Sequence, residues 1–401
     1  MAAPGARVAE HGREAIVLAL NSGSSSLKFG LYRVGYGRIA TLVSGAADAF
    51  GESGCRFHAE DAGGAVLSSE QVAMTGPRDA LARIDTLLSH STLPHPTVVG
   101  HRMVHGGPSL RRHCVIDDGV LRQLDAAAPF APLHTPAALA AIGFARTHFP
   151  DVPQVACFDT AFHAGLPEVA RVLPIPRALQ ADGIQRYGFH GLSCESIVRQ
   201  LAHDPPRRLI IAHLGNGASI TAVRDGVSVD TSMGLTPSGG IIMGTRSGDL
   251  DSGVLVYLMQ EKGFDATRIA ELVDHRSGML GVSGLSGDMR RLHQAAATDA
   301  DARLAIEMFC YAVGKQIAAM IAVLDGVDVI VFTGGIGEND AQVRAAACKG
   351  LAWIGVSIDA ARNRATHNPV SDAVSRCSVL VLSSRENEEI ALHAWQLTAQ
   401  R

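Results

Sequence analysis

One short pattern occurs twice in the chain and constrains its fold more than any other feature. Residues 15–34, AIVLALNSGSSSLKFGLYRV, and residues 208–226, RLIIAHLGNGASITAVRDG, each consist of an apolar β-branched run, a polar turn rich in glycine, and a second run of alternating apolar residues. Each copy predicts a β-hairpin with an asparagine, Asn21 or Asn216, at the head of its turn. A duplicated domain is the economical interpretation, and a chance resemblance between two hairpins is the alternative.

Strand-like runs elsewhere alternate with alanine-rich stretches of helical period, such as residues 305–324 followed by the apolar run 327–332. This alternation predicts the α/β class, with mixed sheets flanked by helices and a cleft between the two halves where the chemistry should be sought. The expected parts are a disordered tail at 1–14, an N-terminal domain at 15–165, a C-terminal domain at 166–389, and a helix at 390–401 that packs back on the N-terminal domain.

Composition excludes several classes of protein. Among the 401 residues, 35 Lys and Arg against 39 Asp and Glu provide no electrostatic attraction to nucleic acid or to anionic membranes. The seven cysteines form no CxxC pair, which argues against a disulfide framework or a zinc knuckle and favours a reducing cytoplasm. Neither a signal-peptide core in the first 13 residues nor a run of 18 apolar residues is evident, so we expect a soluble protein.

The first hairpin turn, NSGSSSLK at 21–28, offers backbone N–H groups and hydroxyls where small side chains do not block a polyanion. It lacks the GxxxxGK[ST] spacing of a Walker A loop, so Lys28 would act as a point charge on phosphate. The alternative is an ordinary serine-rich turn.

The segment FTGGIGEN at 332–339 follows an apolar strand and precedes a helical stretch. Its glycines permit close backbone approach to a nucleotide, with Gly335, Gly337 and Asn339 as candidate adenosine-site residues. The GxGxxG spacing fails at Asp340, which disfavours NAD binding.

Two arginines and three histidines stand in glycine-rich or tight-turn contexts. Arg102 in GHRMVHGG and Arg246 in MGTRSGD suit carboxylate and phosphoryl oxygens, although either alone would more often be a structural ion-pair partner. His134, His190 and His213 could donate hydrogen bonds to a phosphoryl group. Because they form no metal-binding spacing, a zinc site is not expected, and the carboxylates of Asp159 and of the segment SRENEEIA match a hard cation such as Mg²⁺ better.

Nine short motifs occur in the order NSGSSSLK, GHRMVHGG, APLHTP, FDTAFH, YGFHG, HLGNGAS, DTSMGLTP, MGTRSGD and FTGGIGEN. With these motifs, the chain resembles the acetate kinase family over residues 16 to about 396. The resemblance implies membership of the acetate and sugar kinase, Hsp70 and actin superfamily, whose two duplicated domains of the actin-like ATPase (ribonuclease H-like) type hold a nucleotide between them. It also implies a homodimer, ATP as co-substrate, and Mg²⁺ or alternatively Mn²⁺ as the cofactor.

The family pattern carries roles over to matching positions. The resemblance implies catalytic roles for Asp159, Arg102, Arg246, His190 and His134. It implies an acceptor pocket formed by Arg102, Val104, Leu133, Phe189 and Pro237. The implied nucleotide contacts are Ser24, Ser26, Lys28, His213, Leu214, Gly215, Asn216, Gly217, Asp288, Met289, Arg290, Gly335, Ile336, Gly337, Glu338 and Asn339.

The same resemblance implies Asn21 and Glu386 as metal residues, with Glu388 left open because the family usually has NEE at this place. Three further departures from the family pattern stand out: APLHTP in place of APLHNP, FHGLSC with Cys194 replacing a histidine, and TPSGG in place of TPLEG. They put a secondary histidine role and the loop packing near Ser238 and Gly239 in doubt.

The expected reaction is direct in-line transfer of the ATP γ-phosphoryl group to acetate, which gives acetyl phosphate and ADP. A carboxylate with a reference pKa of about 4 is already ionised near neutral pH, so no general base is needed, and Asp159 is expected to orient groups or bind a metal-bound water. A propionate or butyrate kinase and a catalytically silent nucleotide-binding scaffold remain alternatives.

Overall fold

The computed structural model describes residues 14–23, 26–35, 38–48, 50, 54–89, 92–132 and 134–399. It divides into two compact units: unit 1 comprises Met1–Ala161 and Arg385–Arg401, and unit 2 comprises Phe162–Ser384. The chain passes from one unit to the other at Ala161–Phe162 and again at Ser384–Arg385, a few residues from the divisions expected at 165 and 389. Apart from Glu14, the predicted tail lies outside the described residues.

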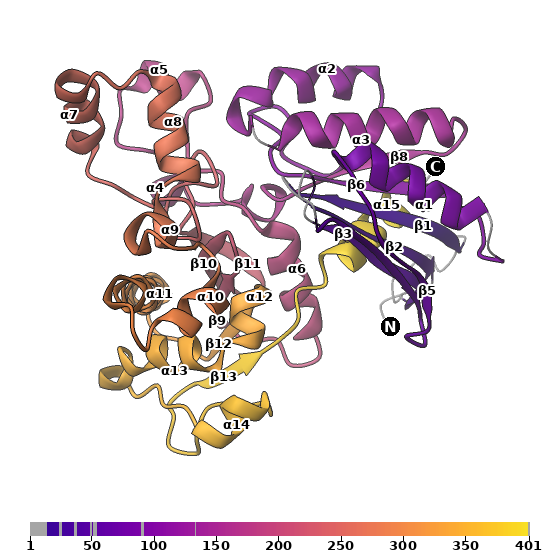
Figure 1. The fold of residues 1–401 in the computed structure, drawn as a ribbon. Coiled ribbons are helices and arrows are strands. Elements are labelled where there is room, and N and C mark those ends of the chain that lie inside the picture. The colour runs from indigo at the N-terminus through magenta and orange to yellow at the C-terminus, as the bar shows by residue number, and fades with distance from the viewer. Residues whose placement is uncertain are drawn as a thin grey trace, which may run out of the picture. The chain divides into compact units, whose positions relative to one another are not determined.

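Unit 1 contains one mixed sheet of eight strands in the order β5-β4-β3-β2-β1-β6-β8-β7 (Figure 1). The hairpin β1–β2 continues into antiparallel β3, β4 and β5, while β6 and β8 are parallel to β1. The strands are β1 (Ala15–Ser22), β2 (Ser26–Gly35), β3 (Arg38–Asp48), β4 (Arg56–Asp61), β5 (Val66–Gln71), β6 (Val98–Met103), β7 (Cys114–Val115) and β8 (Gln154–Phe158).

Helices cover this sheet because alternate strand residues bury opposite faces. Leu18 and Leu20 of β1 share a core with Ala141 of α3 and with residues of α1. On β6, a Cβ added at Gly100 would lie 2.6 Å from Cγ2 of Ile390, so this glycine lets α15 approach the strand. The helical elements are α1 (Pro77–Ser89), α2 (Asp118–Ala126), η1 (Ala128–Phe130), α3 (Thr135–His148) and α15 (Glu386–Ala399).

The C-terminal helix begins earlier than the sequence suggested. It starts at Glu386 rather than near Ile390, with three glutamates in its first turn, where carboxylates favour a helix N-terminus. It packs on β1, β2, β6 and β8 of unit 1.

Unit 2 contains a second mixed sheet, of five strands in the order β11-β10-β9-β12-β13. Strands β9, β10 and β11 are antiparallel neighbours, and β12 and β13 continue the sheet in parallel with β9. The strands are β9 (Arg208–Leu214), β10 (Ala218–Arg224), β11 (Val227–Thr231), β12 (Val329–Thr333) and β13 (Ser378–Val381).

The two sheets share one topology. The inner strands β3-β2-β1-β6-β8 of unit 1 correspond in order and direction to β11-β10-β9-β12-β13 of unit 2. The two repeated sequence segments form the hairpins β1–β2 and β9–β10 at equivalent places in this order. The prediction of a duplicated α/β fold is confirmed.

The helices of unit 2 flank its sheet, and α6 and α11 do so most extensively. Cys194 and Ile197 of α6 share a core with Leu209 and Ile211 of β9, whereas α11 packs on β9 and β10. The helical elements are η2 (Ala161–His163), which spans the boundary, α4 (Glu168–Arg171), α5 (Arg177–Ala181), α6 (Gly191–Gln200), α7 (Ser252–Lys262), α8 (Ala266–His275), α9 (Gly278–Ser283), α10 (Met289–Ala295), α11 (Ala300–Leu324), α12 (Gly334–Asn339), α13 (Ala341–Lys349), η3 (Ala352–Ile354) and α14 (Ala360–Ala365).

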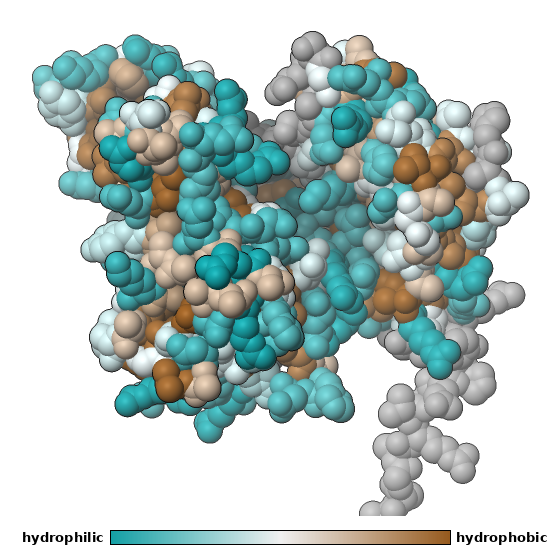
Figure 2. All heavy atoms as spheres, turned by 60° about the horizontal axis from the view of Figure 1, so that its bottom comes forward, coloured by the Kyte–Doolittle hydropathy of each residue, from teal (hydrophilic) through white to brown (hydrophobic). Residues whose placement is uncertain are grey.

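Helix α11 is the one helix in the described part of the chain that is long and apolar enough to cross a bilayer. The sequence shows no uninterrupted run of 18 apolar residues, and no membrane span was expected from it. A core helix of a globular domain meets the same criterion, and α11 buries Phe309, Val313 and Ile317. Apolar side chains are also visible at the surface, among polar ones, in Figure 2.

Candidate active site

A buried ion pair lies at the ends of two neighbouring parallel strands of unit 1. Arg102 is near the end of β6, and Asp159 directly follows β8. The Arg102 guanidinium donates from Nε to both carboxylate oxygens, at 3.0 and 3.1 Å, and from Nη2 to Oδ2 at 2.6 Å. The Asp159 side chain is 1% exposed and that of Arg102 is 16% exposed. Burial by itself would lower the pKa of Arg102, but the carboxylates of Asp159 and Glu386 outweigh it and raise that pKa above its ordinary value.

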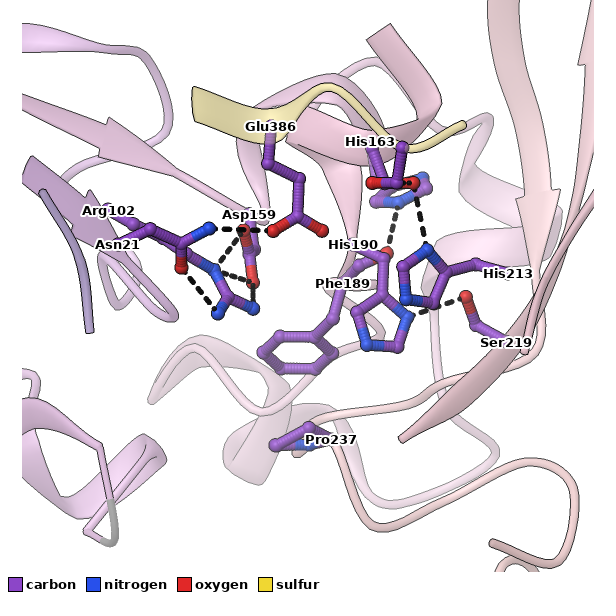
Figure 3. Close-up of polar contacts among 12 residues, drawn as sticks. Asn21, Arg102, Asp159, His163, Phe189, His190, His213, Ser219, Pro237 and Glu386 are labelled. Atoms are coloured by element: carbon purple, nitrogen blue, oxygen red, sulfur yellow. Dashed lines mark hydrogen bonds and ion pairs between the residues drawn. The ribbon is translucent and has the colours of Figure 1, made fainter. Parts of the chain in front are cut away.

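Asn21 links this ion pair to the first turn of α15 (Figure 3). Its Oδ1 accepts a hydrogen bond from Nη1 of Arg102 at 3.1 Å, and its Nδ2 donates one to Oε2 of Glu386 at 2.8 Å. Because β1 and β6 are adjacent in the sheet, a residue of the first hairpin reaches the arginine more than eighty positions away. We name Asn21, Arg102, Asp159 and Glu386 the carboxylate cluster.

The neighbouring glutamate lies in different surroundings. Glu388 is 3.8 Å from the guanidinium of Arg385. The pKa of Tyr32 is raised, first by burial and then by the charge of Glu388, so this carboxylate is also close to the phenol. Of the two candidates that the sequence left open, Glu386 is the one hydrogen-bonded to Asn21.

The carboxylate cluster offers donors that suit magnesium. Two carboxylates and an amide oxygen are hard ligands, and Mg²⁺ typically takes one or two carboxylates and completes its shell with water and substrate phosphates. The Arg102 cation engages both oxygens of Asp159 and the amide oxygen of Asn21, whereas Oε2 of Glu386 accepts from the Asn21 amide, so Glu386 is better suited than Asp159 to direct contact. The donor set therefore fits a partly hydrated Mg²⁺ or Mn²⁺.

Other predicted residues of unit 1 have simpler surroundings. Lys28 is exposed on β2 opposite Asn21, and directly opposite residues of an antiparallel pair project from the same face. Val104 is buried just after β6, and His134 is half-buried at the N-cap of α3. Ser26 begins β2. The predicted contacts Ser24 and Leu133 lie outside the described residues.

In unit 2 two imidazole rings stack on each other. The rings of His190 and His213 have centroids 4.1 Å apart and planes inclined by 22° (Figure 3). His190 has left-handed backbone geometry, with φ of 58°, at the start of α6, and its Nδ1 is 2.9 Å from Oγ of Ser219. His213 is on β9, and its Nδ1 is 2.8 Å from Oγ of Ser193. Each ring is therefore oriented through Nδ1 by a serine.

The turn Gly215–Asn216–Gly217 between β9 and β10 is bordered by donor groups. A Cβ added at Gly217 would lie 3.3 Å from both Nη1 of Arg246 and Nε2 of His190. A Cβ at Gly215 would lie 3.9 Å from the backbone N of Gly335 and 4.0 Å from Nε2 of His213. A larger side chain at either glycine would crowd these groups, so the absence of a Cβ leaves the turn open to the approach of phosphate oxygens.

A cavity of about 550 Å³ adjoins this turn. Eight predicted nucleotide contacts line it: Gly215, Asn216, Asp288, Met289, Arg290, Gly335, Ile336 and Asn339. The lining also includes Gly287 and Asp340, which sequence reasoning missed. Asp340 had served only to exclude a dinucleotide motif, and its side chain bonds His293 at 2.8 Å.

Three other predicted nucleotide contacts, Leu214, Gly337 and Glu338, do not line this cavity and are buried or bonded to the backbone. Leu214 is buried in β9 and Gly337 is buried in α12. Oε1 of Glu338 accepts hydrogen bonds from the backbone N–H groups of Gly334 and Ser384, both at 3.0 Å. The GGIGEN segment, expected as a glycine-rich connection ahead of a helix, itself forms the short helix α12.

The backbone around Phe189 is held by a histidine that sequence reasoning did not assign. His163 lies 2.9 Å through Nε2 from the carbonyl oxygen of Phe189 and 2.8 Å through Nδ1 from Oγ of Ser228. Burial lowers the pKa of His163 to about 4, so the ring is neutral near pH 7 and donates from Nε2 to the carbonyl. It is the last residue of the motif FDTAFH, the one sequence signal that could have marked it.

The departures from the expected family pattern also have visible surroundings. The buried thiol of Cys194 is 3.8 Å from Oγ1 of Thr221. The hydroxyl of Ser238 donates to the carboxylate of Asp274, and Nη1 of Arg246 donates to the carbonyl oxygen of Pro237 at 3.3 Å. The altered loop is thus tied both to α8 and to the arginine beside the bare turn.

Comparisons with known proteins agree on one family. The model of the acetokinase family matches residues 16–392. The acetate kinase of Methylocella silvestris is 44% identical over 400 residues, which cover 96% of this chain and 98% of that protein. The acetate kinase of Nitrobacter hamburgensis is 39% identical over 393 residues, which cover 96% of each chain.

Solved structures give the same result. A propionate kinase from Francisella tularensis superposes with a TM-score of 0.88 at 36% identity, over 96% of this chain and all of that one. The acetate kinase of Porphyromonas gingivalis superposes with a TM-score of 0.83 at 35% identity, over 96% of this chain and 99% of that one. With the duplicated sheets, these matches confirm the predicted fold of the actin-like ATPase type.

Proposed function

The chain belongs to the acetokinase family, and on that premise we propose that it is an acetate kinase. It transfers the γ-phosphoryl group of ATP reversibly to the acetate carboxylate, giving acetyl phosphate and ADP. The observation that carries this proposal beyond the family match is the bare Gly215–Gly217 turn. Nη1 of Arg246 and Nε2 of His190 each lie 3.3 Å from the position that a Cβ would take at Gly217, so two groups suited to phosphoryl oxygens lie together at a turn without side-chain bulk.

The transfer needs no general base, because a carboxylate of pKa about 4 is already an anion at neutral pH. Asp159 is poorly suited to be one, since both of its oxygens accept hydrogen bonds from Arg102. We assign Asp159 to orienting Arg102, which binds the acceptor carboxylate or the transferring group through its remaining guanidinium face. The acetate oxygen then attacks the γ-phosphorus as the bond to the ADP oxygen breaks.

Charge on the phosphoryl oxygens is the main obstacle when two anions react. Arg246, His190 and Lys28 are assigned to compensate it, and His134 is assigned to the same task. Donors of this kind act most strongly when they are held in place before the reaction, as His190 is by Ser219 and Arg246 is by the carbonyl of Pro237.

Mg²⁺, or Mn²⁺ in its place, would be held by Glu386 and Asn21. When bound, such a cation neutralises charge on the nucleotide phosphates. The hydrogen bond between the Asn21 amide and Glu386 fixes the orientation of both side chains before a cation arrives.

The nucleotide is assigned to the cavity of about 550 Å³ in unit 2. Asp288, Met289 and Arg290 form one wall of the cavity, and Gly335, Ile336 and Asn339 form another. ATP fits this assignment because its phosphates can extend along the Gly215–Gly217 turn, at the edge of the same cavity.

We assign the acceptor pocket to Arg102, Val104, Leu133, Phe189 and Pro237. Apolar side chains suit a methyl group. A propionate kinase is the second candidate, because a solved structure with that name superposes at a TM-score of 0.88. One methylene changes selectivity by only about 1–3 kcal/mol, so acetate preference is a matter of degree.

We also propose a cytoplasmic homodimer of two-domain protomers. Helix α7 supports the dimer: it has no buried residue in the described structure, yet it carries Val254, Val256, Tyr257 and Met259 in exposed positions. An apolar helix without a covering partner is typical of a subunit interface. The seven free cysteines support a reducing compartment.

The decisive assay incubates purified protein with Mg-ATP and acetate, propionate or butyrate, and traps acyl phosphate with hydroxylamine as the hydroxamate. Turnover highest with acetate supports the proposal, and turnover highest with propionate or butyrate supports the second candidate. A folded protein that binds ADP but forms no hydroxamate with any of the three would be a catalytically silent scaffold.

A further inference from the structure

A short chain of hydroxyl groups ends at the His213 ring. The hydroxyl of Ser384, in the last residue of unit 2 before the chain re-enters unit 1, donates to Oγ of Ser193 at 3.0 Å. Oγ of Ser193 is in turn 2.8 Å from Nδ1 of His213. The Ser193 side chain is fully buried at the start of α6. All three residues belong to unit 2, and we name them the serine relay.

Counting protons along the serine relay determines the state of the imidazole. Each hydroxyl has a single hydrogen to donate. The hydroxyl of Ser384 donates its hydrogen to Ser193, which leaves Nδ1 of His213 as the acceptor for the hydrogen of Ser193 among the described partners. A neutral ring that accepts at Nδ1 carries its own proton at Nε2. The relay therefore favours the Nε2–H tautomer.

The protonated nitrogen lies close to the bare turn. Nε2 of His213 lies 4.0 Å from the position of a Cβ at Gly215, and the N–H of Gly335 lies 3.9 Å from the same point. Gly215 also lines the nucleotide cavity. Nε2 thus lies near the turn where the phosphates are assigned, and the tautomer decides whether this nitrogen carries a hydrogen or a lone pair.

Ser384, at the other end of the serine relay from His213, is connected to helix α12 through its backbone. The backbone N–H of Ser384 donates to Oε1 of Glu338, and the same oxygen accepts from the N–H of Gly334. Glu338 and Gly334 belong to α12, whose residues Gly335, Ile336 and Asn339 line the cavity. The position of the Ser384 hydroxyl therefore depends on how α12 is placed.

We propose that Ser193 and Ser384 are positioning residues, which act in series to hold His213 as a neutral Nε2–H donor toward the phosphoryl oxygens. Neither serine touches the assigned nucleotide position. The arrangement matches that of metal-binding histidines, whose second nitrogen is fixed by an outer partner that sets the tautomer and orientation. This inference rests on the proposed kinase function only for the identity of the oxygens, because the tautomer is a property of the protein alone.

The first experiment measures the tautomer directly. Long-range ¹H–¹⁵N correlation spectra of protein labelled with [¹⁵N]histidine distinguish a ring protonated at Nε2 from one protonated at Nδ1, and the signal absent from His213→Asn identifies His213. We expect Nε2–H in the wild-type protein and a mixed population in Ser193→Ala. Ser196→Ala, which removes a buried hydroxyl that donates to the backbone carbonyl of Ser193 at 2.8 Å but leaves the Ser193 hydroxyl in place, should leave the His213 signal unchanged. An Nδ1–H signal in the wild-type protein would overturn the proposal.

The second experiment measures hydroxamate formation. Ser193→Ala should lower kcat about 10-fold with little change in the KM for acetate, and Ser384→Ala should lower it about 3-fold. Because the residues act in series, the double variant should be no slower than Ser193→Ala. Ser384→Thr keeps the hydroxyl at a half-buried position and should recover wild-type kcat.

The two experiments separate the possible failures. Losses that multiply in the double variant, or a Ser384→Thr variant as slow as Ser384→Ala, would show that the serines do not act through His213. If no carboxylate is phosphorylated at all, the proposed function fails, and the spectra still decide whether the relay sets the tautomer.

Discussion

Neutralising Asp159 tests the carboxylate cluster most directly. Asp159→Asn keeps the shape of the side chain, but one of the two oxygens that accept from Arg102 becomes an NH₂ group. That group faces guanidinium N–H groups, so a charge-assisted contact is replaced by two opposed donors. The Arg102 cation then keeps Asn21 and the charge of Glu386 as its partners.

The expected loss of stability follows from this burial. Removing one partner of a buried ion pair costs about 3–5 kcal/mol. Arg102 is 16% exposed rather than fully buried, so the lower end, about 3 kcal/mol, applies. For a domain of this size, that corresponds to a fall in Tm of about 6–12 °C. Activity should fall about 100-fold, because the guanidinium loses the group that orients it.

Thermal unfolding and the hydroxamate assay measure the two effects on the same preparation. A matched control is Asp118→Asn, also in unit 1, where a carboxylate that is 76% exposed lies 3.2 Å from a 46% exposed Arg146. Such surface pairs contribute about 0–1 kcal/mol, so this variant should keep both its Tm and its activity.

The reasoning would be refuted by an Asp159→Asn variant that unfolds within a degree or two of the control. A stable variant with strongly reduced kcat would point instead to a direct chemical role for the carboxylate. A destabilised variant with normal kcat would make the ion pair purely structural.

Four further outcomes follow from the same geometry. Arg246→Ala should lower kcat about 100- to 1,000-fold while ADP affinity, measured by calorimetry, changes little; near-normal turnover would contradict its role. Glu386→Gln should raise the Mg²⁺ concentration for half-maximal activity about 10-fold, whereas an unchanged titration would remove Glu386 from the metal site. Burial lowers the pKa of His163 from 6.5 to about 4, so unfolding takes up a proton in this window and the free energy of unfolding falls as pH drops from 6.5 to 4. His163→Gln should lose that part of the slope, about 1.4 kcal/mol per pH unit, in urea titrations. Tyr257→Asp should shift sedimentation from dimer to monomer, and an unchanged sedimentation coefficient would exclude α7 from the interface.

The repeated hairpin was readable in the sequence because it is a local feature. Alternating apolar residues and a glycine-rich turn specify a hairpin within about twenty positions, and two copies around Asn21 and Asn216 specify a duplication. The eight and five strands of the two sheets then follow the same inner order. The start of α15 was less predictable, because the three glutamates of its first turn look like a solvated loop until the helix is seen.

The parts that the sequence did not reveal depend on distant contacts. Glu386 and Glu388 are two positions apart, and only the direction of the first turn of α15 brings Glu386 to Asn21, 365 positions away. Similarly, the role of His163 depends on Phe189, which joins it through a backbone carbonyl that has no sequence signature. Patterns report periodicity and turns, whereas such pairings arise from the packing of whole elements.

The late position of α15 in the chain has a consequence for biosynthesis. Unit 2 is one continuous stretch, whereas unit 1 needs α15 to cover the face of β1 and β6 where Gly100 meets Ile390. During translation, the face of β1 and β6 therefore stays uncovered while the more than two hundred residues of unit 2 are synthesised. Unit 2 can complete its fold first, and the nascent chain should need protection by chaperones until its last helix emerges.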